Sequence, residues 1–281
     1  MNEFWQSLSN REKSLVIWIT LFVAWIFINS GTRSSALAVL KSLFLTQIGA
    51  ILLGVIAYMT LVIYLAYTAS LWKASLLKDT LFWFFGAALV LFFDINKART
   101  VSYFRLAIVD LFKWGIFTEF ILNLYTFGLE VELILLPVGV LLFLVKVYAG
   151  MRGEDQAKKA ANVLLNFIGS IMIFYVLYKS IVQYEEIFRV DHVYEILLPI
   201  FLTIALIPVL YALALYMVYE TLFIRVAYLG RDAKHQTEIK VAVLRIAGLN
   251  LNRLDEISKK ISYDRIHAND SAINAIKSLV S

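Results

Sequence analysis

The chain has 281 residues and a net charge of +5; 61% of its residues are hydrophobic and 17% are charged. Soluble domains are about 45–50% apolar and about 25% charged, so this composition excludes an ordinary soluble protein. The lack of cysteine excludes disulfide bonds, thiol nucleophiles and cysteine-bound metals. Long apolar blocks instead predict an all-α, polytopic membrane protein.

Six stretches of the chain carry no charged side chain, and four of them reach or exceed the length of a membrane span: 14–32, 42–72, 160–178 and 196–219. A helix needs about 20 residues, at about 1.5 Å each, to cross a hydrocarbon core of about 30 Å. Together with the apolar run that begins at Ala107, they predict about seven hydrophobic segments, of which six or seven cross the membrane. The first is predicted to be a retained anchor helix because it contains many bulky aromatic residues. The uncharged stretches are residues 14–32, 42–72, 80–93, 133–145, 160–178 and 196–219.

Residues 36–72 are too long for one span and are predicted to divide into a shallow interfacial helix and a tilted span from about Gln47. Within that span, Ala50 and Gly54 form a small-xxx-small step, which favours close helix packing and predicts a homo-oligomer. Segment 80–93 has only 14 residues, or about 21 Å of helix. Whether it crosses is left open, and the membrane side of the N-terminus is open with it.

Three charged residues interrupt the next apolar run, AIVDLFKWGIFTEF. Asp110 and Lys113 are three residues apart, close enough on a helix to form a structural ion pair. Glu119 lies on the opposite side of that helix, and Asn123 and Thr126 continue its face. Because a charge near the bilayer centre costs at least about 2.5–3.5 kcal/mol, this polar stripe is predicted to face protein or water.

Two interpretations of the stripe are open. In one, the ion pair lies at the cytoplasmic interface and Glu119 is protonated or hydrogen-bonded inside a closed bundle. In the other, Glu119 lines a path for ions or protons. A second polar stripe and three intramembrane prolines favour a path or gate, because proline removes a helix hydrogen bond and permits a kink. The second stripe is Asn162, Asn166 and Ser170, and the predicted kinks are at Pro137, Pro199 and Pro208.

The distribution of Lys and Arg orients the second half of the chain. Residues 152–159 carry three such charges, whereas residues 183–195 carry only Arg189. The first connection is therefore predicted to be cytoplasmic and the second external, and the turn at residues 128–132 is external as well. Residues 225–281 hold ten Lys or Arg against six Asp or Glu, which predicts a cytoplasmic tail beside anionic lipid in a bacterial cytoplasmic (inner) membrane.

The chain is predicted to comprise a transmembrane helical domain, residues 1–224, and a basic helical tail, residues 225–281. The tail is expected to hold one helix behind a capping signal at Asn252 and a second short helix further on. Residues 238–249 fit a helix and a strand equally well. Nucleic acid is not an expected partner, because the tail lacks the turn glycine and the wing of a helix-turn-helix. The helical spacing rests on Leu254, Ile257 and Ile261, then on Ile273, Ile276 and Val280.

No enzyme is predicted, because metalloprotease, serine-hydrolase, P-loop and dinucleotide-binding motifs are all missing. The three histidines are scattered, and neither a cofactor nor a metal ion is expected. We predict an oligomeric channel or transport-type protein with Glu119, Asn123 and Thr126 on its polar route. The alternative is a membrane-embedded assembly or signalling component that recruits a cytosolic partner through the basic tail.

Overall fold

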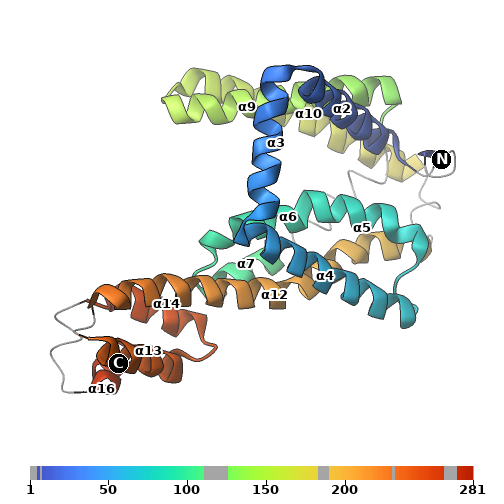
Figure 1. Cartoon of the computed structure of the whole chain (residues 1–281). Coiled ribbons are helices and arrows are strands. Elements are labelled where there is room, and N and C mark those ends of the chain that lie inside the picture. The colour runs from blue at the N-terminus through green and yellow to red at the C-terminus, as the bar shows by residue number, and fades with distance from the viewer. Residues whose placement is uncertain are drawn as a thin grey trace. The chain divides into compact units, whose positions relative to one another are not determined.

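The computed structural model describes residues 5–6, 8–110, 126–182, 190–229, 232–262 and 271–280. Every regular element in these ranges is a helix (Figure 1), so the prediction of an all-α chain is confirmed for them. The chain divides into two compact units, Met1–Gly54 with Trp114–Ile196 and Val55–Lys113 with Leu197–Ser281. The predicted division into residues 1–224 and 225–281 stays a prediction.

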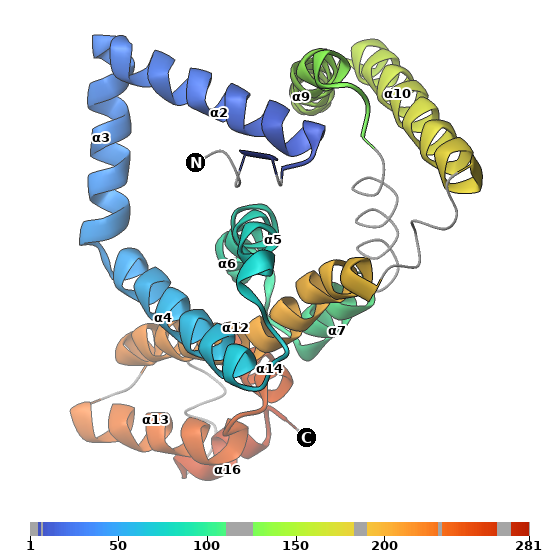
Figure 2. The ribbon, with the colours of Figure 1, turned by 90° about the vertical axis from the view of Figure 1, so that its right-hand side faces the viewer.

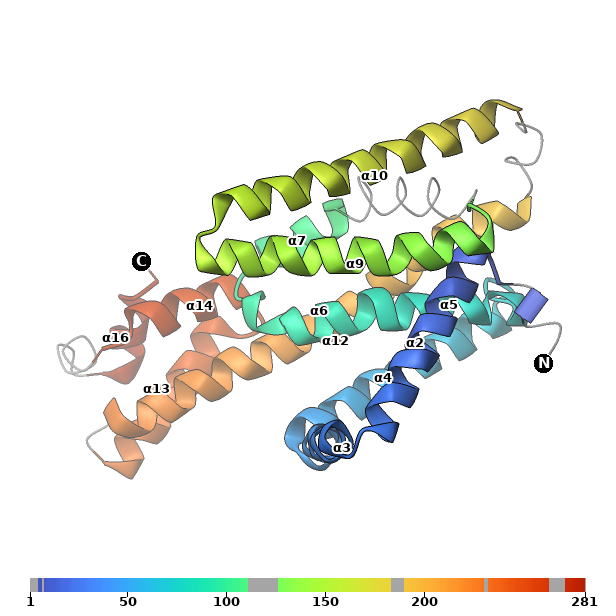
Figure 3. The same cartoon turned by 90° about the horizontal axis from the view of Figure 1, so that it is seen from above.

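The first unit contains a helical hairpin. Helix α9, Leu129–Arg152, and helix α10, Asp155–Val182, lie side by side (Figure 3). The reversal between them depends on Gly153, whose φ of +72° lies in the left-handed region that side chains disfavour. Many aliphatic side chains of both helices are exposed, as fits helices that contact lipid rather than water.

Two further helices open the first unit. Helix α2, Asn10–Ile28, begins with a capping box: the Ser9 hydroxyl accepts from the Glu12 N–H at 3.3 Å, and the Glu12 carboxylate accepts from the Ser9 N–H at 2.6 Å. The chain then bends by 106° into helix α3, Ser30–Leu45. Figure 2 shows the bend between α2 and α3. It is at Asn29, which leaves the helical conformation and caps α3 with its side chain.

The second unit is organised around α12, the 40-residue helix Val190–Leu229. Trp83 donates a hydrogen bond to the Thr203 hydroxyl at 2.8 Å. Tyr58, on helix α4 (Gln47–Thr68), donates one to the Ala205 carbonyl at 2.9 Å. These two bonds join α12 to segments that lie more than 100 residues earlier in the chain. The buried side chains of α12 recur every three or four residues, which is the period of one helix face. They include Leu202, Leu206, Leu210, Ala214, Val218, Leu222 and Val226.

Residues 74–97 form one irregular helical segment of the second unit. A π-helical turn in its middle adds a residue to the helical repeat and so shifts the faces on either side of it. The segment is followed by α7, Val101–Asp110. Its five pieces are η1 Ala74–Leu76, α5 Leu77–Trp83, η2 Phe84–Ala88, α6 Leu89–Phe93 and η3 Asp94–Lys97.

Five of the described helices are long and apolar enough to cross a membrane, and the bent pair α2–α3 makes a sixth if it counts as one span. Such helices fit a membrane protein. The predicted count of about seven is not confirmed, because most of the run that begins at Ala107 lies outside the described residues. Segment 80–93 belongs to a 24-residue helical run that is long enough to cross. The five are Gln47–Thr68, Ala74–Lys97, Leu129–Arg152, Asp155–Lys179 and Leu197–Tyr228.

Helix boundaries confirm the predicted division near Gln47, since α3 ends at Leu45 and α4, Gln47–Thr68, begins one residue after Thr46. The three prolines lie inside uninterrupted helices. Pro137 is within α9, and Pro199 and Pro208 are within α12. Kinks at these residues stay predictions.

Candidate functional site

Helix α12 is longer than a membrane span. Its 40 residues correspond to about 60 Å, roughly twice the thickness of a hydrocarbon core. Three of its side chains bind the C-terminal tail within the second unit. Tyr211 donates to the Leu249 carbonyl at 2.7 Å, and Tyr219 donates to the Gly248 carbonyl at 2.6 Å. The third, Arg225, donates to the Ser258 carbonyl. From Tyr211 to Arg225, these contacts extend over about four turns of α12.

The described part of the tail consists of three short helices (Figure 1). Helices α13, Ala233–Ala247, and α14, Leu251–Lys260, are joined by a turn at Gly248, whose φ of +50° disfavours any other residue. Helix α16, Ala272–Lys277, packs against α13. The fully buried side chains of these helices include Ile239, Val243, Leu251, Leu254, Ile257 and Ile276.

The structure corrects one expectation for the tail and resolves another. The cap of α14 is Asn250, whose side chain accepts from the Arg253 N–H at 3.1 Å, and not Asn252. Asn252 lies inside the helix and accepts instead from the Val101 N–H at 2.8 Å. Residues 238–249, which fit a helix and a strand equally well, are helical through Ala247.

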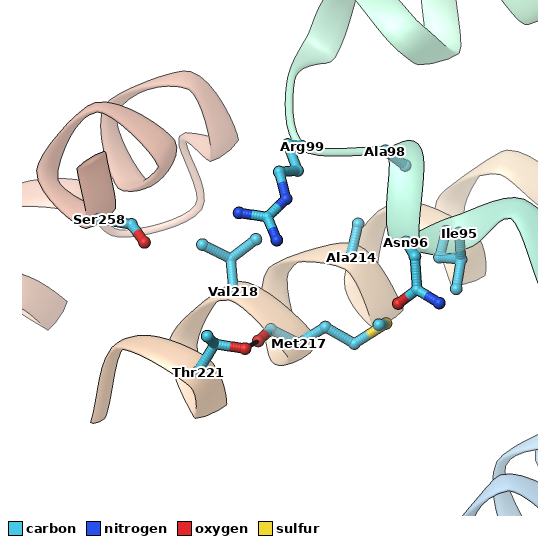
Figure 4. A pocket seen from close by; sticks show the side chains of 9 residues that line it. All are labelled: Ile95, Asn96, Ala98, Arg99, Ala214, Met217, Val218, Thr221 and Ser258. Atoms are coloured by element: carbon cyan, nitrogen blue, oxygen red, sulfur yellow. Dashed lines mark hydrogen bonds between the residues drawn. The ribbon is translucent and has the colours of Figure 1, made fainter. Parts of the chain in front are cut away.

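A pocket lies where the loop before α7 meets α12 and α14 (Figure 4). Its volume is about 60 Å³, several times the space that one water molecule needs. The guanidinium of Arg99 extends from the loop into the space between Val218 and Ser258 (Figure 4). The remaining lining residues are Ile95, Asn96, Ala98, Ala214, Met217 and Thr221.

Two arginines lie near Ser258. Arg225 donates from its two terminal nitrogens to the Ser258 carbonyl at 2.9 Å and to the Ser258 hydroxyl at 2.7 Å. Arg99 lines the pocket beside the same serine. Within the described residues neither arginine forms an ion pair with a carboxylate. The Ser258 side chain itself is buried.

The neighbouring lysines differ from these arginines because each has a carboxylate partner. Lys97 pairs with Asp94 at 2.8 Å, Lys259 with Asp255 at 2.5 Å and Lys260 with Glu256 at 2.6 Å. Asp94 also acts electrostatically on Tyr103, on α7. Partial burial raises the pKa of the Tyr103 hydroxyl, and the negative charge of Asp94 adds to that rise.

A separate polar cluster ties α2 to α9 in the first unit. Glu132 is 2% exposed and accepts from Arg11 at 3.0 and 3.3 Å and from the Phe127 N–H at 3.1 Å. Ser14 donates to the Glu132 carbonyl at 3.0 Å, and Asn10 donates to the Phe127 carbonyl at 3.0 Å. The beginning of α2 therefore lies at the beginning of α9.

Most of the predicted polar stripe falls outside the described residues. Lys113, Glu119 and Asn123 lie there, and so does the side chain of Asp110, the last residue of α7. Thr126 is half-buried just before α9. On α10, Asn162 is half-buried, whereas Asn166 and Ser170 are exposed.

Comparison with known proteins gives no match: no protein-family model, curated protein or solved structure matches the chain. Among the described residues, no group of three or more His, Asp or Glu is placed to hold a metal ion. The candidate site must therefore be judged on its own geometry.

Sequence reasoning overlooked the pocket. Arg99, Arg225, Tyr211 and Tyr219 were not among the predicted site residues. No local pattern joins these positions, because they meet Ser258 and Gly248 only after the tail folds back along α12. The single available signal was a helix whose apolar and aromatic pattern continues beyond the length of one span.

Proposed function

We propose that this protein is a multi-pass membrane component of an assembly or signalling system, in which α12 couples a cytoplasmic helical domain to the membrane. The observation that carries this proposal is the attachment of the tail to α12 by Tyr211, Tyr219 and Arg225. A tail linked by a flexible tether would transmit nothing. A tail bonded along four turns of a continuous helix must move with that helix.

The membrane half of α12 contains the features that coupling would require. Pro208 has no N–H, so the carbonyl of Ile204 has no partner in the helix. Tyr58 donates to the adjacent carbonyl of Ala205, and Trp83 donates to Thr203 one turn before Pro208. A displacement of the tail would reach this proline-containing region and change its contacts with α4 and α5.

Placement and partners are part of the same proposal. With residues 152–159 cytoplasmic, the tail lies in the cytoplasm of a bacterial cell whose inner membrane holds the protein. The expected partners are a cytosolic protein, anionic lipid and further copies of the chain. Ala50 and Gly54, the small-xxx-small step, are both exposed, which supports packing of α4 against a second copy.

Photo-crosslinking in cells tests recruitment of a cytosolic protein. A photoreactive phenylalanine is placed at Thr237 or Leu244, both exposed on α13, and in a matched control at Leu141, exposed on the lipid-contacting face of α9. We expect one discrete adduct with a cytosolic protein from α13 and none from Leu141. Adducts with lipid or with the chain itself alone, from both α13 positions, would contradict recruitment.

A second candidate function is an oligomeric channel or transport-type protein. Asn166 and Ser170 are exposed on α10, and polar side chains in the bilayer are expected to face protein or water. In proteoliposomes, ion or proton flux that Glu119→Gln reduces without loss of assembly would support this candidate. Absence of flux for monovalent cations, protons and anions would favour the coupling role.

A further inference from the structure

The pocket between the loop before α7, α12 and α14 presents hydrogen-bond donors and no carboxylate. The guanidinium of Arg99 and the amide of Asn96 form no side-chain hydrogen bond within the described residues. The Ser258 hydroxyl accepts from Arg225, which leaves its own proton available. The Thr221 hydroxyl is already used, because it donates to the Met217 carbonyl at 2.8 Å. Three donors therefore remain for one acceptor-rich ligand.

The electrostatics of the pocket also favour an anion. Arg225 binds Ser258 and Arg99 lines the pocket beside it, and neither arginine has a carboxylate partner within the described residues. The three lysines nearby, in contrast, are all paired. The carboxylate closest in sequence, Asp255, is neutralised by Lys259. Guanidinium groups present planar pairs of N–H donors that match the oxygens of phosphate.

The size and the position of the pocket limit which ligands it could bind. A volume of about 60 Å³ is enough for a single tetrahedral group. Its α12 residues lie around Glu220, the first charged residue of α12 after the uncharged stretch 196–219. If α12 crosses the bilayer, this level is that of the lipid headgroups, so the nearest source of a phosphate is a phospholipid.

We propose that this pocket binds the phosphate group of an anionic ligand, with Arg99 as the principal contact and Asn96 and Ser258 as further donors. The proposal is independent of the coupling role of the tail. It assigns Arg225 a positioning role, since this arginine orients Ser258 by two hydrogen bonds and adds a positive charge beside it.

Native mass spectrometry of the full-length protein in detergent tests the proposal. The probes are dioleoyl-phosphatidylglycerol, dioleoylglycerol with the same chains and no phosphate, and inorganic phosphate as a competitor. Arg99→Gln removes the principal donor. Lys97→Gln is the matched control. It also removes one positive charge, only two residues from Arg99, but the Lys97 side chain is bound to Asp94.

We expect one phosphatidylglycerol to be retained by the native protein and by Lys97→Gln, and Arg99→Gln to bind it about tenfold more weakly or worse. Dioleoylglycerol should not be retained. Competition by inorganic phosphate would identify a free phosphate or a soluble phosphate ester as the ligand, and lack of competition would identify the lipid.

Equal losses in Arg99→Gln and Lys97→Gln would overturn the proposal, because they would show a general effect of surface charge. Retention of the phosphate-free lipid, or wild-type binding by Arg99→Gln, would also overturn it. If Arg99→Gln lowers the melting temperature, Arg99→Lys serves in its place. This variant keeps the charge but loses the paired donors, so its affinity must lie between those of the native protein and Arg99→Gln.

Discussion

The hydroxyl of Tyr211 donates to the carbonyl oxygen of Leu249 at 2.7 Å and accepts the backbone N–H of Leu251 at 3.3 Å. Tyr211 lies within the uncharged stretch 196–219, so these bonds bring the turn between α13 and α14 back to the level of the last apolar helix. Leu249 is 80% exposed at that level. An exposed leucine at the membrane surface is stable where it can enter the interface, so the tail is expected to rest on the bilayer.

Removing the tyrosine hydroxyls should loosen the tail. We expect Tyr211→Phe and Tyr219→Phe each to lower the free energy of unfolding of the tail by about 1 kcal/mol, and the double variant by about 2 kcal/mol. Limited proteolysis of the purified protein should then cleave the tail faster. Tyr216→Phe is the control, because Tyr216 is exposed and its hydroxyl forms no hydrogen bond within the described residues. Equal cleavage of all variants would show that the two bonds do not hold the tail.

The turn at Gly248 should not tolerate a side chain. Its φ of +50° and ψ of −125° are costly for any L-residue, by about 1–3 kcal/mol. We therefore expect Gly248→Ala to destabilise the tail by that amount in the same proteolysis assay. Gly169→Ala, at an α10 position with open space around the new methyl group, should leave cleavage unchanged. If both variants behave alike, the strain at Gly248 is not real.

The buried Arg11–Glu132 pair should be more costly to break than to replace. Arg11→Met leaves the Glu132 carboxylate buried at 2% exposure without its guanidinium, at an expected cost of about 3–5 kcal/mol. The double variant Arg11→Met/Glu132→Leu removes both charges and should recover most of that loss. Thermal unfolding in detergent measures both, with Glu130→Gln, exposed at the same end of α9, as the control. A double variant less stable than Arg11→Met would contradict this account.

The same contact predicts the membrane side of the N-terminus. Asn10 and Arg11 bind Phe127 and Glu132, and the turn at residues 128–132 is predicted to be external. Because the native chain has no cysteine, single cysteines at Gln6, Glu130 and Asp155 report topology without background. Gln6→Cys and Glu130→Cys should react with a membrane-impermeant maleimide in intact cells, and Asp155→Cys only after permeabilisation. Opposite sides for positions 6 and 130 would disprove the α2–α9 contact.

Local sequence patterns were enough to find the apolar helices and some of their ends. The break at Thr46 and the helical spacing of Leu254 and Ile257 can be predicted from short stretches of sequence. The spans can be predicted from the length of the apolar stretches alone. The cap of α14 was misplaced by two residues because Asn250 and Asn252 are both good caps. In the structure Asn250 accepts from the Arg253 N–H, whereas Asn252 is used in a long-range contact with Val101.

Contacts between distant residues were beyond sequence reasoning. Glu132 belongs to the turn that was predicted to be external, and its burial against Arg11 depends on how α2 meets α9. Arg99 and Ser258 are likewise joined only by the return of α14 to the loop before α7. Charges in the printed sequence do not reveal which of them are paired, and the unpaired ones define the candidate site.

The most direct test of the coupling role is the distance between α12 and the tail, measured by pulsed electron paramagnetic resonance. Spin labels on Ile204→Cys, exposed in the membrane half of α12, and Thr237→Cys, exposed on α13, report it in lipid nanodiscs. The account predicts one narrow distance distribution that broadens in the Tyr211→Phe/Tyr219→Phe background. A broad distribution in the native background, unchanged by the two substitutions, would contradict it.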